Sequence, residues 1–345
     1  MTAVQSEADA LRASIRVQSS PVSATAKQTF RDFAAGEPTL PVFSQPWWLD
    51  ATAGPDGWDV VCVIDAAGQV QAALPFAVQR PRSFSVLGMP PLSQTLGPWM
   101  RPFPARESTR LAREKDFIGE LLDALPPYDH YGQSWHHRVT NWLPAYWRGY
   151  AQTTRYTYRL QSLTDLKSVW EGMQSNIRGD IRKAQERFDV KIESDASFDD
   201  FLRLNDLTFE RQGKASPYGH DVLHRLDGAA AAQHARRVII ARDAAGRAHA
   251  GAYLVWDAEA AYYLMGGGDP ELRNSGATSL CIWEAIKFAA SVTKSFDFEG
   301  SMIEPVERFF RAFGAIQTPY FAISRTTSWQ LRARRAVREL LPPKR

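Results

Sequence analysis

The sequence predicts an α/β (α+β) fold of two tandem lobes, each with a mixed, largely antiparallel sheet flanked by helices. The first observation is length, because 345 residues are enough for about two domains at roughly 150 residues each. The second is a series of strand-like runs at 236–243, 249–257 and 260–268, whose short polar turns are typical of an antiparallel meander. The third is the helix-like run and further strand-like run that follow them, because a crossover helix at this point indicates a mixed sheet.

The first half of the chain alternates helical and strand patterns. The aromatic run FSQPWWLDATAG predicts a short helix that Gly54 and Pro55 end. The apolar runs 58–65 and 69–79, joined by a short turn, predict a β-hairpin. Further strands are expected at 83–89 and 128–135, with a helix between them at 106–125.

The second half is richer in regular structure. A helix is predicted at 176–188, because its apolar residues recur at i, i+4, i+7 and i+11 and so share one face. The other helices are expected at 164–173, 197–213, 275–291 and 304–314. The strands besides the meander are expected at 155–163, 190–193, 294–300 and 320–324.

These patterns divide the chain into four parts. The parts are a polar lead-in at 1–35 that need not be ordered, a first lobe at 36–153, a second lobe at 154–326, and a basic C-terminal helix or tail at 327–345. The arginines and lysines of the tail can contact the phosphates of tRNA or, peripherally, an anionic membrane surface. A solvated terminal helix is the alternative.

Composition excludes several classes of protein. Lys and Arg number 41 against 38 Asp and Glu, a net charge of +3, so no field of one sign draws the chain onto nucleic acid, and no DNA partner is expected. No apolar run reaches the ~18 residues of a membrane span, and the N-terminus lacks the apolar core of a secretion signal. Cys62 and Cys281 lie far apart in apolar runs, which predicts buried thiols in the cytoplasm. The histidines form no metal-binding pattern, so no metal is expected.

The junction between the run 260–268 and the following helix carries the clearest functional pattern. Glycines end the strand, a polar loop follows, and the helix starts near Ser275 or Gly276. The first N–H groups of a helix lack partners and carry partial positive charge, so they can bind a phosphate or pyrophosphate. Gly276 would let such a ligand approach the backbone, and Arg273 would add a cation. A purely structural junction is the alternative, and the motif is not a P-loop.

The same junction resembles a known motif. Arg273, Gly276, Ala277 and Thr278 form an Arg-x-x-Gly-Ala-Thr sequence that resembles the Gln/Arg-x-x-Gly-x-Gly/Ala pyrophosphate loop of GCN5-related N-acetyltransferases (GNAT). Threonine stands in place of the final small apolar residue. The resemblance implies that coenzyme A or a related anionic donor binds here.

Two further segments resemble Fem-type peptidyltransferases and their GNAT-like relatives, including the CelD-like acetyltransferase branch. The run NIRGDIRKAQERFDVKI at 176–192 is similar to the family's Arg-x-x-Ile-Arg-Lys-Ala helix. The segment 296–325 is similar to its Asp-Phe-x-Gly, Phe-Lys-x-x-Phe-Gly and tyrosine-containing strand, with Arg311 where lysine is common. The resemblance covers about residues 40–325 and is strongest in the second half.

The resemblance implies two GNAT-like lobes that transfer an acyl or aminoacyl group to an amine. The donor would be acyl-CoA or aminoacyl-tRNA, used as a co-substrate with no tightly bound cofactor. The acceptor would be an amine of a peptidoglycan or other envelope precursor, or of a small molecule. The residues assigned to the donor are Met265, Gly266, Arg273, Ser275, Gly276, Ala277, Thr278, Phe310 and Arg311.

Amide formation needs a neutral amine, a stabilised oxyanion and a protonated leaving group. Backbone N–H groups at 264–266 can stabilise the oxyanion, because donors that are fixed in advance do so best. Asp297 and Glu299 are the catalytic candidates, since residues two apart in a strand face one side, and we expect one of them to take the amine proton or to bind the acceptor ammonium. Ion pairs with Arg308 or Arg311 are the alternative.

The acceptor is expected to meet polar residues on loops, because loops between rigid elements often carry ligand contacts. The segment RQGKASPYGH combines cations, glycine, proline and an aromatic ring. The candidates are Arg211, Lys214 and Tyr218 in this segment, Arg308 after the strand at 294–300, and Gln94 in the first lobe. Structural roles are the alternative for each.

Two other functions fit the same sequence. One is a scaffold for envelope or polysaccharide assembly that keeps the fold and has lost the chemistry, because the short helix after Gly300 carries Phe309 and Phe310 but no tyrosine. The other is a tRNA-binding module that uses the arginines of 178–187 and the tail.

Overall fold

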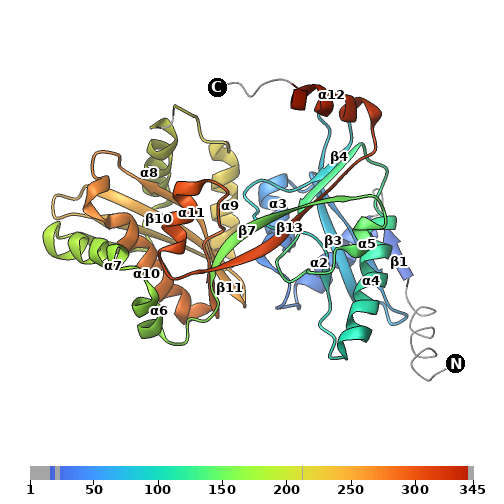
Figure 1. Ribbon diagram of the computed structural model, residues 1–345, viewed down its shortest axis with the longest axis horizontal. Helices are drawn as coiled ribbons and strands as arrows, with labels where there is room; N and C mark the ends of the chain where they lie inside the picture. The colour runs from blue at the N-terminus through green and yellow to red at the C-terminus, as the bar shows by residue number, and fades with distance from the viewer. Residues whose placement is uncertain (1–15, 20–23, 212, 341–345) are drawn as a thin grey trace. The chain divides into compact units, whose positions relative to one another are not determined.

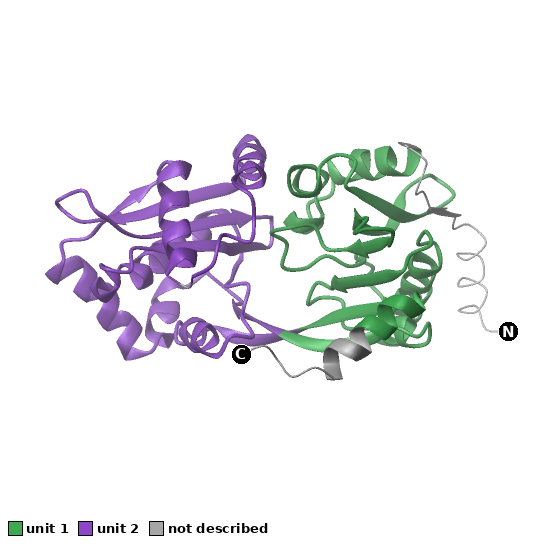
Figure 2. Ribbon diagram, turned by 90° about the horizontal axis from the view of Figure 1, so that it is seen from above, with its two compact units in different colours: residues 1–155, 320–345 green, residues 156–319 purple. Residues whose placement is uncertain are grey.

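The computed structural model describes residues 16–19, 24–211 and 213–340. Within them the chain forms two compact units (Figure 2), unit 1 from residues 1–155 and 320–345, and unit 2 from residues 156–319. The chain enters unit 2 inside strand β7 (Ala151–Leu160) and leaves it inside strand β13 (Ile316–Thr326). Unit 1 therefore takes most of its residues from the first half of the sequence, and unit 2 takes most of its residues from the second half.

Unit 1 is built on a mixed sheet. Its other described elements are β1 (Arg16–Ser19), α2 (Ala24–Ala34), η1 (Val42–Ser44), α3 (Pro46–Ala53), β2 (Trp58–Ile64), β3 (Val70–Gln79), β4 (Val86–Gly88), β5 (Trp99–Met100), α4 (Glu107–Asp123), β6 (His130–Ser134), α5 (Leu143–Tyr146) and α12 (Trp329–Leu340). The strand order is β1-β2-β3-β4-β6-β13, and β5 pairs with β3. β2 and β3 form the predicted antiparallel hairpin, whereas β4 and β6 run parallel.

Helices cover the sheet of unit 1 because each carries an apolar stripe. α4 buries Phe117 and Leu121 in a cluster with β2 and β3. α2 buries Phe30 completely, edge-on to Trp58. Residues 24–34 belong to the expected polar lead-in, yet they form α2, because Phe30 has an apolar site to fill. Residues 1–15 and 20–23 of that lead-in lie outside the described residues.

Unit 2 carries the longer series of elements (Figure 1). After β7 they are α6 (Leu166–Gly172), α7 (Ser175–Arg182), η2 (Lys183–Arg187), β8 (Lys191–Ser194), α8 (Phe198–Glu210), α9 (His220–Ala232), β9 (Arg236–Arg242), β10 (Ala248–Trp256), β11 (Ala260–Gly268), η3 (Arg273–Ser275), α10 (Ala277–Val292), β12 (Ser295–Asp297) and α11 (Glu304–Arg311). The strand order is β7-β12-β11-β10-β9-β8. The meander β9-β10-β11 is antiparallel, as predicted, and β11 and β12 form the parallel pair that α10 connects.

Helices pack on both faces of this sheet. Ala252 and Leu254 of β10 lie in the apolar cluster that contains α7 and α10. Tyr253, between them in sequence, packs instead on Phe198 and Phe201 of α8. Because successive strand residues point to opposite faces, α10 and α8 cover opposite faces of the sheet. The mixed sheet flanked by helices confirms the predicted fold class.

Three local expectations differ from the structure. Helix α9 was missed, although its buried Leu223, Leu226 and Ala230 recur at helical spacing. The expected helix 176–188 is α7 followed by a π-helical turn, η2. The expected strand 294–300 ends early, at Asp297, the last residue of β12. The chain turns after it through Glu299 and Gly300, which both have left-handed backbone conformations.

Gly276 is a point where the fold requires glycine. Its φ is +83°, and a Cβ built there would lie 2.3 Å from the Asp180 carbonyl oxygen of α7. We expect Gly276→Ala to lower the free energy of unfolding by about 2 kcal/mol or more, because left-handed backbone and close approach both penalise a side chain. Gly179→Ala is the control, since no atom of another element lies within 4 Å of that Cβ position, and it should stabilise by about 0.5–1 kcal/mol. Chemical denaturation measures both, and equal stabilities would contradict this packing.

Candidate active site

Unit 2 has an open strand edge where β11 outlasts its partner β12. Their parallel pairing ends at Tyr262 and Asp297, whereas β11 continues beyond that point. A β-bulge at Leu264 interrupts the register with β10. Met265 and Gly266, assigned to the donor from the sequence, lie on this stretch.

Helix α8 takes part of this edge, since the Asn205 side-chain amide donates to the Gly266 carbonyl oxygen at 2.7 Å and the Gly268 N–H donates to the Thr208 hydroxyl at 3.2 Å. Bulges are frequent beside active sites, so the stretch around Leu264 is a candidate ligand contact.

Tyr263 is a candidate that the sequence reasoning missed. Its ring packs edge-on against Phe310 of α11, with 6.0 Å between ring centres. A Cβ on Gly266 would fall 1.9 Å from the Tyr263 hydroxyl oxygen, so the hydroxyl lies over the Gly266 backbone. Burial raises the pKa of Tyr263, so the phenol stays protonated and can donate a hydrogen bond. The sequence feature that could have indicated this role is the glycine run 266–268, because residues without a side chain leave room for a neighbouring ring.

Asp297 is held tightly within the protein. Its side chain is 1% exposed and lies 3.3 Å from the Nε of Arg159 in an ion pair. It accepts hydrogen bonds from the Thr157 hydroxyl and from the backbone N–H of Glu299, the latter at 2.8 Å. Asp297 therefore joins the end of β12 to β7 and orients Glu299. Its ion pair is with β7, not with the arginines of α11.

Glu299 combines backbone strain, burial and unmet hydrogen-bonding capacity. Its φ of +59° lies in the left-handed region, which is costly for a residue with a side chain. Its buried Oε1 has no hydrogen-bond partner among the described residues. Burial, and then the charge of Asp297, raise the pKa of Glu299 well above its usual value. A perturbed, strained carboxyl of this kind is typical of a general acid or base.

The backbone of β7 holds the turn that contains Glu299. Gly300 has φ +62°, and a Cβ there would lie 2.3 Å from the Tyr156 carbonyl oxygen. The backbone N–H of Phe298 donates to the Tyr158 carbonyl oxygen at 2.9 Å. The turn is therefore fixed on both sides of Glu299.

Helix α11 is tied to the same strand by a polar network. Glu307 accepts hydrogen bonds from the Tyr158 hydroxyl at 2.6 Å and from the Nε of Arg311 at 2.8 Å. The Nε2 of Gln317 donates to the Tyr158 hydroxyl oxygen at 2.7 Å. The hydrogen bonds from Tyr158 and Arg311 lower the pKa of Glu307. Arg308 and Arg311 are both exposed, and Arg311, assigned to the donor, is paired with Glu307.

The start of α10 differs from the expectation about Gly276. Ser275, Gly276 and Ala277 are buried, and α7 occupies the space beside the Gly276 α-carbon. The glycine therefore admits a helix, and not a ligand, on that side. Arg273 is exposed and Thr278 is half-buried, so these two side chains of the motif stay accessible.

The acceptor candidates do not all fall in one unit. Arg211 and Lys214 are exposed, and Tyr218 is partly buried, in the connection between α8 and α9 of unit 2. Gln94 lies between β4 and β5 of unit 1. Phe310, assigned to the donor, is buried in the apolar cluster of unit 2.

Other chemistries find little support in the described part of the chain. Burial raises the pKa of the Cys62 thiol to about 12 and also raises that of Cys281, so both free thiols are unreactive. In residues 16–19, 24–211 and 213–340, no group of three His, Cys, Asp or Glu side chains could hold a metal ion. The helices of the same residues include none with the length and apolarity to cross a bilayer.

Part of unit 2 is similar in sequence to a known protein family. Residues 172–302 match the family model of the acetyltransferase (GNAT) domain. This stretch is therefore similar to GNAT domains, and the resemblance to GNAT acyltransferases is confirmed over these residues. No curated protein matches the chain significantly in sequence.

Two solved structures share the fold over most of the chain. FemX aligns with a TM-score of 0.64 at 11% identity, covering 89% of this chain and 96% of that structure. A tandem GNAT protein from the clavulanic acid biosynthesis pathway aligns with a TM-score of 0.50 at 10% identity, covering 91% and 99%. Identities this low show the fold alone, which is that of tandem GNAT-like lobes.

The raised pKa of Glu299 has a consequence for stability. Unfolding returns the carboxyl to its ordinary pKa of about 4.3, so the folded protein keeps a proton that the unfolded chain has lost. Stability therefore falls as the pH rises between the two pKa values. We expect Glu299→Gln to melt above the wild type at about pH 8, with the difference vanishing near about pH 4.

Glu307→Gln is the matched control, measured in the same thermal melts. The pKa of Glu307 is lowered, so its charge stabilises the folded state above its unfolded pKa, and this stabilisation is lost as the pH falls. The control variant should therefore melt below the wild type at about pH 8. If Glu299→Gln instead melted below the wild type at that pH, the Glu299 carboxyl could not be a buried group whose charge is uncompensated.

Proposed function

We propose that this protein is a GNAT/Fem-like N-acyltransferase that moves an acyl or aminoacyl group from an activated donor to an amine. The donor is acyl-CoA or aminoacyl-tRNA, used as a co-substrate without a tightly bound cofactor. The acceptor is an amine of a cell-envelope precursor, such as a peptidoglycan precursor, or of a small molecule. The similarity of residues 172–302 to GNAT domains supports acyl transfer, and the free thiols support a cytoplasmic enzyme.

The observation that carries the proposal is the buried, unpartnered carboxyl of Glu299. The amine nitrogen attacks the carbonyl carbon of the donor, so a C–N bond forms as the bond to the thiol sulfur or ester oxygen breaks. Glu299 in its ionised form takes the proton from the amine, and the leaving sulfur or oxygen ends protonated. Such proton transfer contributes about 10²–10⁴-fold to a rate.

The surrounding groups divide the remaining tasks. Backbone N–H groups of the β11 edge and the Tyr263 hydroxyl are suited to stabilise the oxyanion, because they are fixed before charge develops. Asp297 acts as a positioning residue, since it holds the backbone of Glu299 and pairs with Arg159.

Donor and acceptor are assigned to different surfaces. Exposed Arg273, with Thr278 and the first N–H groups of α10, binds the phosphates of the donor. The acceptor contacts are proposed to come from Arg211, Lys214, Tyr218, Arg308 and Gln94. Helix α12 carries exposed Trp329, Arg332 and Arg334, which support contact with tRNA or with an anionic membrane surface.

One observation favours a second function, a scaffold for envelope or polysaccharide assembly that has lost the chemistry. α7 covers Gly276, so the helix start that would hold a donor is partly closed. The two functions are separated by mixing the protein with acetyl-CoA or mixed aminoacyl-tRNA and a panel of amines that includes peptidoglycan precursors. Mass spectrometry detects acylated amines. Absence of product with both donors, from folded protein, would favour the scaffold.

The role of Glu299 as base predicts a rate effect. We expect Glu299→Gln to lower kcat by about 10²–10⁴-fold with KM little changed. The wild-type rate should rise with pH through the raised pKa of Glu299, because only the ionised carboxyl accepts the proton. Glu304→Gln is the control, since this exposed acid begins α11, and a comparable loss in both variants would remove Glu299 from the mechanism.

The donor assignment predicts a binding effect. We expect Arg273→Ala to weaken donor binding roughly tenfold, because a charged hydrogen bond to phosphate contributes about 1.5–3 kcal/mol. Calorimetry with coenzyme A and filter binding with aminoacyl-tRNA cover both donors. Arg203→Ala, which removes an exposed arginine of α8, should leave binding unchanged. Unaltered affinity in Arg273→Ala would remove the assignment.

A further inference from the structure

Unit 1 contains a cavity of about 210 Å³ that is open to solvent on one side and is lined by residues of this unit. Part of its wall is apolar and includes Trp99 and Phe103. The charged side chains that line it are Arg101, Arg110, Arg113, Glu114 and Arg138. Four of these five side chains are arginines, whose guanidinium groups can bind an anion where they are not already paired.

Arg113 is a lining arginine that has no carboxylate partner among the described residues. Its Nη2 donates to the side-chain oxygen of Gln71 at 2.8 Å, and its buried Nε has no hydrogen-bond partner. The guanidinium carbon lies 4.1 Å from the ring centre of Phe103. Burial, and then the charge of Arg101, lower the pKa of Arg113, so the two cations lie close enough to repel.

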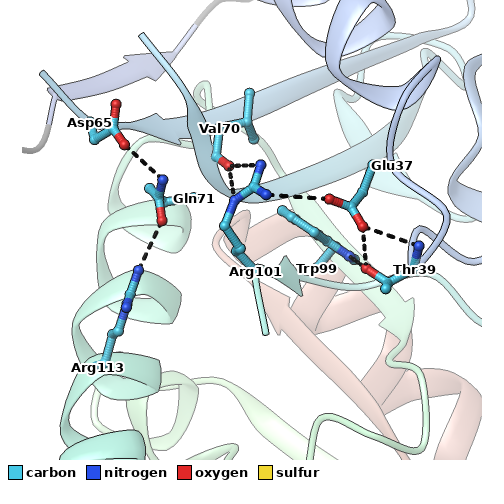
Figure 3. Close-up of polar contacts among 8 residues, drawn as sticks. All are labelled: Glu37, Thr39, Asp65, Val70, Gln71, Trp99, Arg101 and Arg113. Atoms are coloured by element: carbon cyan, nitrogen blue, oxygen red, sulfur yellow. Dashed lines mark hydrogen bonds and ion pairs between the residues drawn. The ribbon is translucent and has the colours of Figure 1, made fainter. Parts of the chain in front are cut away.

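Both of these arginines are held in place (Figure 3). Arg113 is oriented through Gln71, whose amide donates to Asp65 at 2.8 Å. Arg101 donates twice to the Val70 carbonyl oxygen, at 3.0 and 3.1 Å. Side chains fixed in this way lose little entropy when a ligand arrives.

Carboxylates balance the charges of Arg101 and Arg110. Glu37 lies 3.5 Å from the Nη1 of Arg101, a long contact, and its other oxygen is bound to Thr39. Arg110 is paired with both Glu107 and Glu114. The charge that remains without a partner is therefore concentrated at Arg113, next to Arg101.

We propose that this cavity binds a small phosphate-bearing molecule, with its phosphate between Arg113 and Arg101. An anion there would relieve the repulsion between the two cations and satisfy the free N–H of Arg113. The planar fork of a guanidinium matches the oxygens of a phosphate. The apolar wall would cover a small ring or apolar group attached to that phosphate.

Size restricts the ligand. Pockets for drug-sized ligands measure about 300–1,000 Å³, whereas this cavity measures about 210 Å³. The part of a ligand held inside it is therefore about the size of a phosphate or diphosphate with a small attached group. This proposal does not depend on the proposed acyl transfer. Phosphate binding can be measured without a donor and without any product, so one can fail while the other holds.

Calorimetry on the full chain tests the proposal, with inorganic pyrophosphate as the probe and citrate as a carboxylate of similar charge. We expect one pyrophosphate per chain, bound more tightly than citrate. Arg113→Gln should weaken pyrophosphate binding about tenfold or more, since a charged hydrogen bond contributes about 1.5–3 kcal/mol. Lys115→Gln is the control on the same helix, because Lys115 does not line the cavity, and it should bind as the wild type does.

Three results would overturn the proposal. They are no binding of pyrophosphate to the wild type, equal affinity for citrate, and equal weakening by Lys115→Gln, which would indicate general charge attraction. If thermal melts show that Arg113→Gln does not fold, Arg113→Lys decides, because it keeps the charge and loses the fork. Wild-type affinity in that variant would also count against the site.

Discussion

The hydrogen bond from the Glu299 backbone N–H to Asp297 holds the strained turn on which the proposed chemistry of unit 2 depends. A left-handed residue with a side chain costs of order 1–3 kcal/mol, and burying its carboxyl adds to that cost. Contacts with β7 offset it, through the ion pair of Asp297 with Arg159 and the packing of Gly300 on the strand. The two neighbouring acids thus differ, since the Asp297 carboxylate is hydrogen-bonded and paired, whereas the Glu299 carboxyl is buried on a strained backbone, with one oxygen unpartnered in the part of the chain that the structure describes.

Close backbone approach explains much of the remaining architecture. Gly276 admits α7 beside the start of α10, and a Cβ on Gly267 would lie 2.6 Å from the backbone of α8. Gly266 lies beneath the Tyr263 hydroxyl. Glycines that read as a ligand-binding loop in the sequence therefore also serve packing, because a position without a Cβ suits a helix as well as a phosphate. Of β11 beyond its pairing with β12, residues 263–266 are partly exposed.

Electrostatics differ between the two units. In unit 2 the perturbed group is an acid, because burial raises the pKa of Glu299. In unit 1 it is a cation, because burial and the charge of Arg101 lower the pKa of Arg113 beside the cavity. The net charge of +3 indicates neither of these sites, because local charges of opposite sign cancel in the total. Local burial and pairing, and not net charge, indicate where ligands of each sign would bind.

The sequence by itself determined the alternation of helices and strands, the hairpin of unit 1, the meander of unit 2 and the GNAT resemblance. These depend on periodicity and short motifs, which are local. It also placed Asp297 and Glu299 together as candidates. Only the tertiary structure decided their roles, because Thr157 and Arg159 reach Asp297 from more than a hundred residues away along the chain. The covering of Gly276, the position of Tyr263 and the pairing of Arg311 with Glu307 depend likewise on packing between elements, which no local pattern records.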